Sequence, residues 1–289
     1  MTTQLSSKAV VITGASTGIG RACALHFDQL GLRVFAGVRR PADAVDLQQA
    51  ASAGLTPIFI DVTDQATITA AAEQVRTALN GSGLAGLVNN AGIAVGGPLE
   101  FLPAAKLKSQ FEINVLGQMA VTQAFLPLLR PARGRVINMS SISGRIAMPY
   151  LGPYAASKFA LEALNDSLRV ELKPWGIEVI CIEPGAIKTP IWHKSVNEAQ
   201  AMADDLPQQA EKLYGPAMAH LVEAVMRRGE AGIPAETVAK VVAEALLTAR
   251  PKTRYLVGRN AKIGALVAWL LPDRLRDWVV SRHRTYGDR

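Results

Sequence analysis

The sequence predicts a single Rossmann-type α/β domain: a doubly wound parallel sheet with helices on both faces, a small helical lid insertion and a C-terminal extension. Three observations favour this fold class. Short apolar, β-branched runs alternate with longer helical patterns, as in successive βαβ units. The first run leads directly into a glycine-rich turn and a helix. The 289 residues contain no internal repeat or low-complexity linker that would divide the chain into two domains.

The expected strands are short apolar runs, and the expected helices fill the intervals between them. The strands cover residues 9–13, 33–38, 57–61, 86–89, 135–139 and 177–182. The helices cover residues 20–30, 43–53, 64–79, 103–129 and 153–173, and the fourth is interrupted or bent near Pro127. Residues 190–233 are rich in Ala, Met, Gln and charge, and predict one or two helices inserted before a final unit at 234–257. We therefore expect a domain over residues 1–258, with 190–233 as a substrate lid, and an extension over 259–289.

Composition and charge exclude several classes of protein. With 49% hydrophobic and 19% charged residues, the chain is neither disordered nor collagen-like. A net charge of +7 would suit binding to nucleic acid or to an anionic membrane. However, residues 250–289 contain ten basic and three acidic residues, whereas the charges cancel over residues 1–249. The excess positive charge therefore belongs to the last forty residues, which include the C-terminal extension.

Cysteine content and apolar segments predict a cytoplasmic location. Cys23 and Cys181 fall in different expected elements, which does not indicate a disulfide framework and suits a reducing compartment. The first residues contain no long apolar segment followed by a cleavage site, so we expect no secretory signal. The longest uncharged apolar stretch near the C-terminus, residues 263–272, is half the length of about twenty residues that a membrane-spanning helix needs.

The glycine-rich turn, Thr13-Gly14-Ala15-Ser16-Thr17-Gly18-Ile19-Gly20, predicts binding of a dinucleotide. Its glycines permit a tight turn and a close approach of the backbone to a pyrophosphate. The helix that follows offers free N–H groups and the positive end of its dipole to the phosphates. The glycine spacing differs from the standard G-x-G-x-x-G fingerprint, so an ordinary glycine-rich turn between strand and helix is the alternative.

A tyrosine and a lysine, Tyr154 and Lys158, lie four residues apart on one face of an expected helix. A phenol with a pKa of about 10 is a poor proton donor and acceptor at neutral pH, but a nearby cation stabilises the phenolate. Ser140, Ser141 and Ser143 follow the strand at 135–139, at the edge of the sheet where ligands bind. A serine hydroxyl there can bind a carbonyl while the tyrosine protonates it. An exposed helix also produces such Tyr-Lys pairs by chance.

Taken in order along the chain, these motifs resemble those of the short-chain dehydrogenase/reductase superfamily. They are the Gly14-Gly18-Gly20 turn, Asp61, Asn89-Asn90-Ala91-Gly92, Asn114, Ser141, Tyr154 with Lys158, and Pro184-Gly185 with Thr189. The resemblance covers roughly residues 7–258. Residues 149–173 and 180–190 look most like the retinol and hydroxysteroid dehydrogenase branch. The resemblance implies an NAD(P)-dependent alcohol dehydrogenase or carbonyl reductase.

The resemblance also implies a role for individual residues. Tyr154 would be the general acid and base, and Ser141 would position the carbonyl. Lys158 would bind the nicotinamide ribose and lower the pKa of Tyr154. Asn114 would hold a water in a proton relay, although an amide bonded to the backbone is an equal alternative there. The residues expected to contact the cofactor are Gly14, Ser16, Thr17, Gly18, Ile19, Gly20, Arg39, Asp61, Val62, Asn89, Ala91, Gly92, Tyr154, Lys158, Pro184, Gly185, Ile187 and Thr189.

The end of the second strand favours NADP(H) over NAD. NAD enzymes of this type place an acid there to bind the ribose hydroxyls. In this chain the strand ends at Val38-Arg39-Arg40, and Asp43 is the first acid after it. Arg39 can pair with a 2′-phosphate through its planar guanidinium. The alternative is a solvated turn arginine, with NAD as the cofactor.

The substrate side of the expected site is apolar. The residues expected to line it are Ser141, Val95, Met148, Tyr150, Leu151 and Trp192, joined by Ile93, Ile187 and Ile191, with Tyr214 and Met218 closing as a lid. No Arg or Lys stands out as a partner for a carboxylate or phosphate, and no metal site is expected. We therefore predict a bulky apolar alcohol or ketone, such as a retinoid, a steroid or a long-chain carbonyl. Alternatively, these residues form a core beneath the insertion.

The C-terminal extension predicts a peripheral membrane contact through residues 261–284. Residues 261–271 follow an apolar helical pattern, and 274–284 are basic and aromatic. The alternative is that Leu266, Trp269 and Leu270 pack on the domain or on another subunit. No nucleic-acid recognition module is present, so we expect no nucleic-acid partner.

Two further expectations concern assembly and the class of protein. Relatives commonly form dimers or tetramers through the helices corresponding to 103–129 and 153–173. The opposing functional class is a non-catalytic, dinucleotide-sensing regulatory protein on the same fold. Such a protein has no need for Ser141, Tyr154 and Lys158 together, which favours an enzyme.

Overall fold

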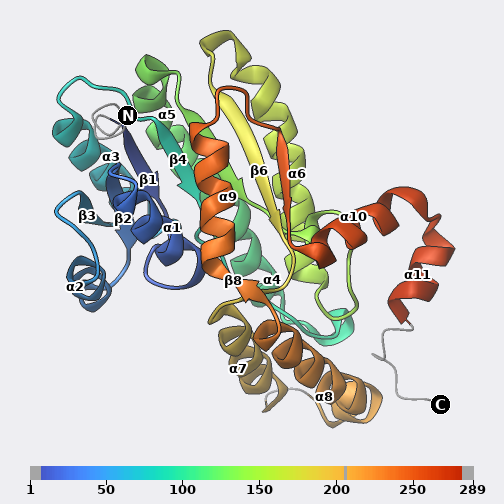
Figure 1. Cartoon of the computed structure of the whole chain (residues 1–289). Helices are drawn as coiled ribbons and strands as arrows, with labels where there is room; N and C mark the ends of the chain where they lie inside the picture. The colour runs from blue at the N-terminus through green and yellow to red at the C-terminus, as the bar shows by residue number, and fades with distance from the viewer. Residues whose placement is uncertain (1–7, 205–206, 282–289) are drawn as a thin grey trace.

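A seven-stranded parallel sheet forms the centre of the computed structural model, which describes residues 8–204 and 207–281. The strand order is β3-β2-β1-β4-β5-β6-β9 (Figure 1). The strands are β1 (Ala9–Ile12), β2 (Arg33–Val38), β3 (Leu55–Phe59), β4 (Gly86–Asn89), β5 (Arg135–Met139), β6 (Glu178–Pro184) and β9 (Arg254–Val257). The order reverses between β1 and β4, so the sheet is doubly wound as predicted.

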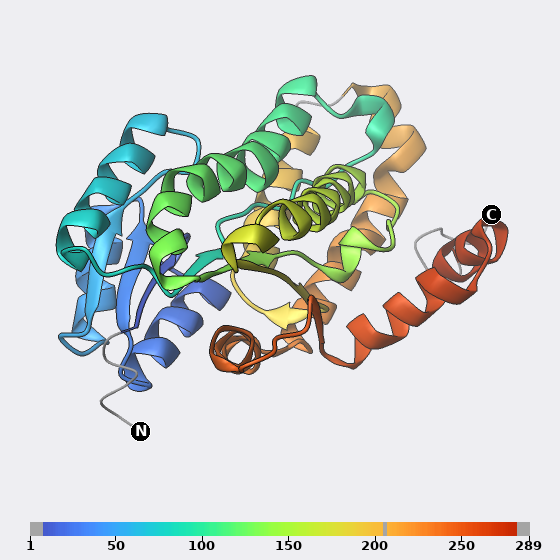
Figure 2. The ribbon, with the colours of Figure 1, turned by 90° about the horizontal axis from the view of Figure 1, so that it is seen from above.

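Helices cover both faces of the sheet (Figure 2). Helices α1 (Gly18–Gln29), α2 (Pro41–Gln49) and α9 (Ala235–Leu247) pack on one face; α3 (Gln65–Leu79), α5 (Gln118–Ala132) and α6 (Gly152–Glu171) pack on the other. Alternate residues of β1 enter the two cores, with Val10 and Ile12 on the α1 side and Ala9 and Val11 on the α3 side. Because the strands are buried on both faces, they are continuous apolar runs, which makes them recognisable in the sequence.

The third strand begins earlier than the sequence predicts. It covers Leu55–Phe59 rather than residues 57–61, and Pro57 lies within it. This strand is the edge of the sheet, where a residue without an N–H group can be accommodated. Pro57 therefore does not mark the start of the strand.

The long helix predicted over residues 103–129 is interrupted, but not at Pro127. It consists of α4 (Ala104–Phe111), a π-helical turn at Glu112–Gly117 and α5, which runs through both Pro127 and Pro131. The π-turn contains Asn114 and ends at Gly117. A Cβ atom at Gly117 would lie 2.6 Å from the carbonyl oxygen of Val62, so the close approach to the neighbouring loop requires glycine.

The insertion forms two helices, α7 (Ile191–Asp204) and α8 (Gln208–Glu230). Two short strands, β7 (Ile187–Lys188) and β8 (Ile233–Pro234), pair in parallel and bring its two ends together. The sequence analysis does not predict these strands, because two residues are too few to form a pattern. The extension forms α10 (Arg259–Leu270) and α11 (Asp273–Ser281), which project from the domain as an arm (Figures 1 and 2).

Candidate active site

One continuous cavity of about 810 Å³ lies at the carboxyl edge of the sheet. Most of the residues that the sequence analysis singles out line it together. They are Gly14, Ser16, Thr17, Gly18, Ile19, Arg39, Asp61, Val62, Asn90, Ala91, Gly92, Ile93, Ser140, Ser141, Ser143, Met148, Leu151, Tyr154, Lys158, Pro184, Gly185, Ile187, Thr189, Ile191 and Trp192. The motifs come from distant parts of the chain, and the parallel sheet brings the ends of their strands to one edge.

The glycine-rich turn has the backbone shape that a dinucleotide site requires. Gly14 and Gly18 have φ angles of 65° and 58°, in the left-handed region that favours glycine. A Cβ atom at Gly14 would lie 2.9 Å from Cα of Ala91. Helix α1 begins at Gly18, and the side chain of the preceding Thr17 forms no capping hydrogen bond with it. The free N–H groups of the first turn therefore fit a pyrophosphate beside them.

Asn90, rather than Asn89, holds this turn. Its Nδ2 donates to the carbonyl oxygens of Thr13 and Gly14, at 3.0 and 3.1 Å. Gly20 packs beneath the turn, because a Cβ atom there would overlap the Asn90 amide, and it does not line the cavity. The two cofactor contacts expected from Asn89 and Gly20 are therefore corrected.

Asn89 faces the interior because successive residues at a strand end point in opposite directions. Its Nδ2 donates to Thr122 Oγ1 at 2.8 Å and to Asn138 Oδ1 at 2.9 Å. Asn89 therefore joins β4 to α5 and β5, whereas Asn90 lines the cavity.

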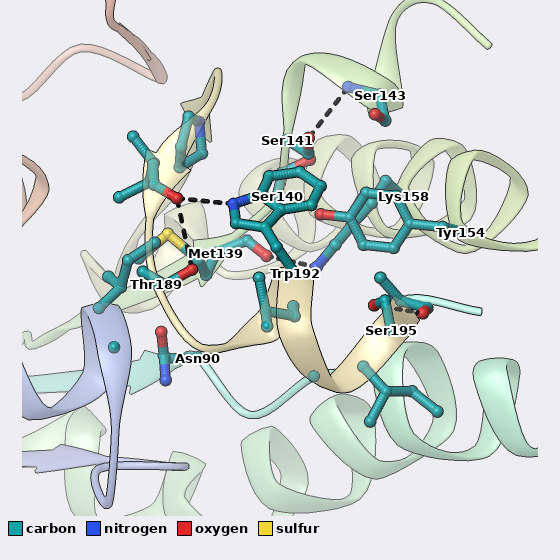
Figure 3. A pocket seen from close by; sticks show the side chains of 18 of the residues that line it. Asn90, Met139, Ser140, Ser141, Ser143, Tyr154, Lys158, Thr189, Trp192 and Ser195 are labelled. Atoms are coloured by element: carbon teal, nitrogen blue, oxygen red, sulfur yellow. Dashed lines mark hydrogen bonds between the residues drawn. The ribbon is translucent and has the colours of Figure 1, made fainter. Parts of the chain in front are cut away.

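Ser141, Tyr154 and Lys158 converge on one region of the cavity (Figure 3). Ser141 follows β5, and its Oγ accepts a hydrogen bond from the N–H of Ser143 at 3.1 Å. Tyr154 and Lys158 project from α6, one helical turn apart. The Lys158 Nζ donates to the carbonyl oxygen of Met139 at 2.7 Å and lies 5.7 Å from the centre of the Tyr154 ring.

Burial is the largest influence on the pKa values of Tyr154 and Lys158. It raises the pKa of the Tyr154 phenol above its ordinary value, although a hydrogen bond with Ser141 opposes the shift. Burial also lowers the pKa of the Lys158 ammonium to about 8. The expected lowering of the Tyr154 pKa is therefore not found, because desolvation outweighs the hydrogen bond.

Asn114 is fully buried in the π-turn and does not line the cavity. Its Oδ1 accepts from the N–H of Ile93, and its Nδ2 donates to the Ile93 carbonyl oxygen, both at 2.9 Å. The Nδ2 also donates to Ser157 Oγ at 3.2 Å. This geometry matches the alternative interpretation of Asn114, in which its amide binds the backbone.

At the β2 end of the cavity, two adjacent arginines have different environments. Arg39 Nη1 lies 3.8 Å from Asp61 Oδ2, and its side chain is 70% exposed. Burial acts to raise the Asp61 pKa, but hydrogen bonds from Thr63 and the charge of Arg39 together lower it. Arg40 instead forms a bidentate ion pair with Asp43 and does not line the cavity.

Two of the expected substrate residues, Val95 and Tyr150, do not line the cavity. Val95 is buried, and its N–H donates to Gln110 Oε1. The ring of Tyr150 stands edge-on to that of Tyr214, whose hydroxyl donates to Glu100 at 2.7 Å. Tyr214 and Met218, which were expected to close over the substrate as a lid, are not among the lining residues either. Helix α8 lines the cavity through other residues.

The structure adds residues from the insertion and the arm that the sequence analysis misses. From α7 and α8 come Lys194, Ser195, Val225 and Arg228, and from α10 and α11 come Asn260, Ile263, Gly264, Val267, Val279 and Val280. The α10 members follow an i, i+3, i+4, i+7 spacing, a signal that could have identified a buried helix face. Lys194 and Arg228 are therefore basic lining residues that the sequence analysis did not single out.

Comparisons with known proteins agree with this geometry. A family model described as short chain dehydrogenase matches residues 8–200. Retinol dehydrogenase 5 of Mus musculus is 41% identical over 94% of this chain and 89% of its own length. An NADPH-dependent 3-dehydrocapnine reductase of Ornithobacterium rhinotracheale is 38% identical over 92% of this chain and 94% of its own.

The fold is also similar to solved structures. A short chain dehydrogenase/reductase from Burkholderia phymatum, in complex with NAD, superposes with a TM-score of 0.77 and 25% identity. The match covers 98% of this chain and 97% of that one.

Proposed function

This chain belongs to the short-chain dehydrogenase/reductase superfamily, in its retinol and hydroxysteroid dehydrogenase branch, and we propose that it transfers a hydride between NADP(H) and a bulky apolar alcohol or ketone. Membership of the family makes it an NAD(P)-dependent oxidoreductase. The observation that carries the rest is the convergence of Ser141, Tyr154 and Lys158 on a cavity that continues to the glycine-rich turn. A non-catalytic sensor would need the turn alone.

The proposed chemistry divides between the cofactor and three side chains. When bound, the nicotinamide gives or takes the hydride. Tyr154 gives its proton to the substrate oxygen during reduction, and Ser141 donates a hydrogen bond to that oxygen. A phenol with its ordinary pKa of about 10 is protonated at neutral pH, so Tyr154 can act as the proton donor for reduction. Lys158 acts as a cation behind the phenol. Asn114 supports the loop at Ile93 and binds Ser157 of α6, the helix that carries Tyr154 and Lys158, rather than touching the substrate.

Two observations support NADP(H) as the preferred cofactor. Arg39 lines the cavity at the end of β2, and the residues directly after this strand include no acid before Asp43 that could bind the ribose hydroxyls. The relative from Ornithobacterium rhinotracheale is described as NADPH-dependent. NAD is the alternative, since the Burkholderia phymatum structure holds it.

The apolar walls of the cavity support a retinoid, a steroid or a long-chain carbonyl as the substrate. Ile142, Met148, Leu151 and Trp192 lie in the same cavity as the three catalytic side chains. A relative that is 41% identical is named a retinol dehydrogenase. In this proposal α7 and α8, within residues 190–233, form the lid over the substrate.

We extend the proposal to location and assembly. Among residues 8–204 and 207–281, no helix is both long and apolar enough to cross a membrane. A cytoplasmic location is supported by the free, buried thiols of Cys23 and Cys181. Peripheral membrane contact through 261–284 is supported by the exposed apolar side chains of the arm; residues 282–284 lie outside the described residues. A homodimer or homotetramer is supported by exposed Leu116, Phe159 and Val170 along the long helices.

Substitution of the tyrosine tests the proposed function. Tyr154→Phe removes the proton donor and keeps the ring, so turnover should fall about a hundredfold or more while cofactor binding persists. Turnover is measured by NADPH absorbance with retinoid, steroid and aliphatic ketones, and cofactor binding by fluorescence titration. Tyr150→Phe is the matched control. Tyr150 lies outside the cavity, so the removal of its hydroxyl should leave turnover intact. Unchanged turnover in Tyr154→Phe would refute the mechanism.

A further inference from the structure

Four basic side chains line the cavity, and three of them have an identified electrostatic or hydrogen-bonding role. Arg39 faces Asp61, and Lys158 donates to Met139. A hydrogen bond from Arg40 lowers the pKa of the Asp43 carboxyl most, and the charge of Lys194 adds to this effect. The fourth, Arg228, forms no ion pair or hydrogen bond with any residue that the structure describes.

Arg228 lies on the substrate side of the cavity. The next residue, Gly229, packs against the indole of Trp192, where a Cβ atom would lie 2.7 Å from Cδ1. Trp192 lines the cavity with Tyr154, and its Nε1 donates to the Ile187 carbonyl oxygen (Figure 3). Helix α8 is on the side of the molecule away from β2, the strand that ends next to Arg39 (Figures 1 and 2). The Arg228 guanidinium is therefore not part of the cofactor end.

The neighbouring walls of the cavity are apolar. Helices α8, α10 and α11 contribute Val225, Ile263, Val267, Val279 and Val280. Asp61 is the sole acidic lining residue in the described part of the chain, and it lies at the β2 end. An anion beside Arg228 would thus meet a cation without facing a carboxylate in the lining, whereas a cationic ligand would be repelled.

We propose that Arg228 binds an anionic group, such as a carboxylate, sulfonate or phosphate, at the end of an apolar substrate away from its reacting carbonyl. The substrate would then be an amphiphile and not a neutral hydrophobic molecule. This inference rests on the proposed function, because it assigns the substrate class of the same site. A guanidinium binds such groups through two parallel hydrogen bonds, which also fixes how far into the cavity the carbonyl extends.

Matched pairs of soluble substrates test the inference. The full chain is assayed with NADPH, without lipid, on fatty acids that carry a methyl ketone at the end of the chain opposite the carboxylate. The acids are of increasing chain length, and each is compared with its methyl ester. At the chain length that spans the cavity, kcat/KM for the acid should exceed that for the ester by about fivefold, as for a partly solvated ion pair. The difference should appear in KM, since the charged group is distant from the reacting atoms.

Two adjacent arginines provide the variants. Arg228→Met should abolish the preference for the acid, and Arg228→Glu should reverse it. Arg227→Met is the matched control, because Arg227 pairs with Glu223 at 3.6 Å and does not line the cavity. The ratio of acid to ester is independent of the amount of folded enzyme. An unchanged KM for NADPH in Arg228→Met would show that Arg228 binds the substrate and not a phosphate of the cofactor.

The outcomes distinguish the two levels of the proposal. Equal kcat/KM for acid and ester at every chain length, or the same loss in Arg227→Met, would overturn the role of Arg228 while leaving ketone reduction intact. A KM for NADPH that rises in Arg228→Met, with no change in the acid-to-ester ratio, would also overturn it. Failure to reduce either form, and failure on the retinoid, steroid and aliphatic ketones as well, with cofactor bound, would overturn the proposed function and the inference together.

Discussion

Arg39 and Arg40 are adjacent in the sequence, yet the structure gives them different surroundings. Arg40 is engaged with Asp43 in a bidentate ion pair at the start of α2. Arg39 reaches the cavity and has a single carboxylate contact, at 3.8 Å, with Asp61. A contact at that distance leaves most of the donors of the guanidinium available for a phosphate.

We therefore expect Arg39→Ala to lower kcat/KM for NADPH by about tenfold or more, with little change for NADH, because hydrogen bonds to charged groups contribute about 1.5–3 kcal/mol. Arg40→Ala is the control, and should leave the ratio of the two cofactors unchanged. Steady-state kinetics with both cofactors provides the measurement. A wild-type preference for NADH, or an equal effect of the two substitutions, would contradict the assignment of NADP(H).

The extent to which the site can be predicted also differs from residue to residue. Ser141, Tyr154 and Lys158 can be identified because a strand end and one helix fix their positions. The choice between Asn89 and Asn90 depends on which way each side chain points at the end of β4, and adjacent identical residues give no signal for it. Arg228 and Val280 could not be predicted, because they reach the cavity through the packing of α8 and α11.

At the scale of elements, the buried parallel strands could be predicted, whereas irregular helical turns caused by tertiary contacts could not. Strands β2, β4 and β5 lie at their expected bounds because each is an apolar run. The π-turn at Glu112–Gly117 arises instead from contacts with distant loops: Asn114 binds the backbone of Ile93, and Gly117 meets Val62. Such contacts leave no periodic pattern in the local sequence, whereas Pro127 is conspicuous but does not end the helix.

The π-turn supplies a prediction about stability. Asn114→Ala would leave the N–H of Ile93 without its acceptor, so the free energy of unfolding should fall by about 1–3 kcal/mol. Urea denaturation followed by circular dichroism measures the change. Gln74→Ala, at an exposed position of α3, is the control and should be nearly neutral. Loss of turnover in Asn114→Ala at unchanged stability would instead favour a role in a proton relay.

At the scale of the whole molecule, the positive charge of the C-terminal part has more than one use. Arg254 donates to Glu162 at 2.9 Å and to Asp166 at 2.6 Å, and lies 3.4 Å from the buried Glu183. It therefore ties β9 to α6 and β6 within the domain. The arm carries Arg259, Lys262, Arg274 and Arg276 beside exposed apolar side chains.

The two faces of the arm have different environments. Ile263, Gly264 and Val267 of α10 line the cavity, whereas Leu266, Trp269 and Leu270 are exposed, Trp269 to 80%. A helix that lines the cavity on one side and presents apolar and basic side chains on the other is suited to a membrane interface.

The combined substitution Leu266→Glu and Trp269→Glu tests this contact without removing the residues that line the cavity. Burial of each large apolar side chain contributes about 1.5–3 kcal/mol, so the loss of two should reduce co-sedimentation with phosphatidylcholine–phosphatidylglycerol vesicles by about tenfold or more. Val45→Glu, an exposed apolar position on α2, is the control and should sediment as the wild type does. If the exposed face packs on another subunit instead, vesicle binding will be the same in all three proteins, and light scattering will show a change in oligomeric state in the double variant alone. The double substitution leaves the cavity face of α10 unaltered, so turnover of a water-soluble ketone should persist whether the exposed face contacts a membrane or another subunit. Persistent turnover would show that the double variant is still folded and has lost only the surface contact.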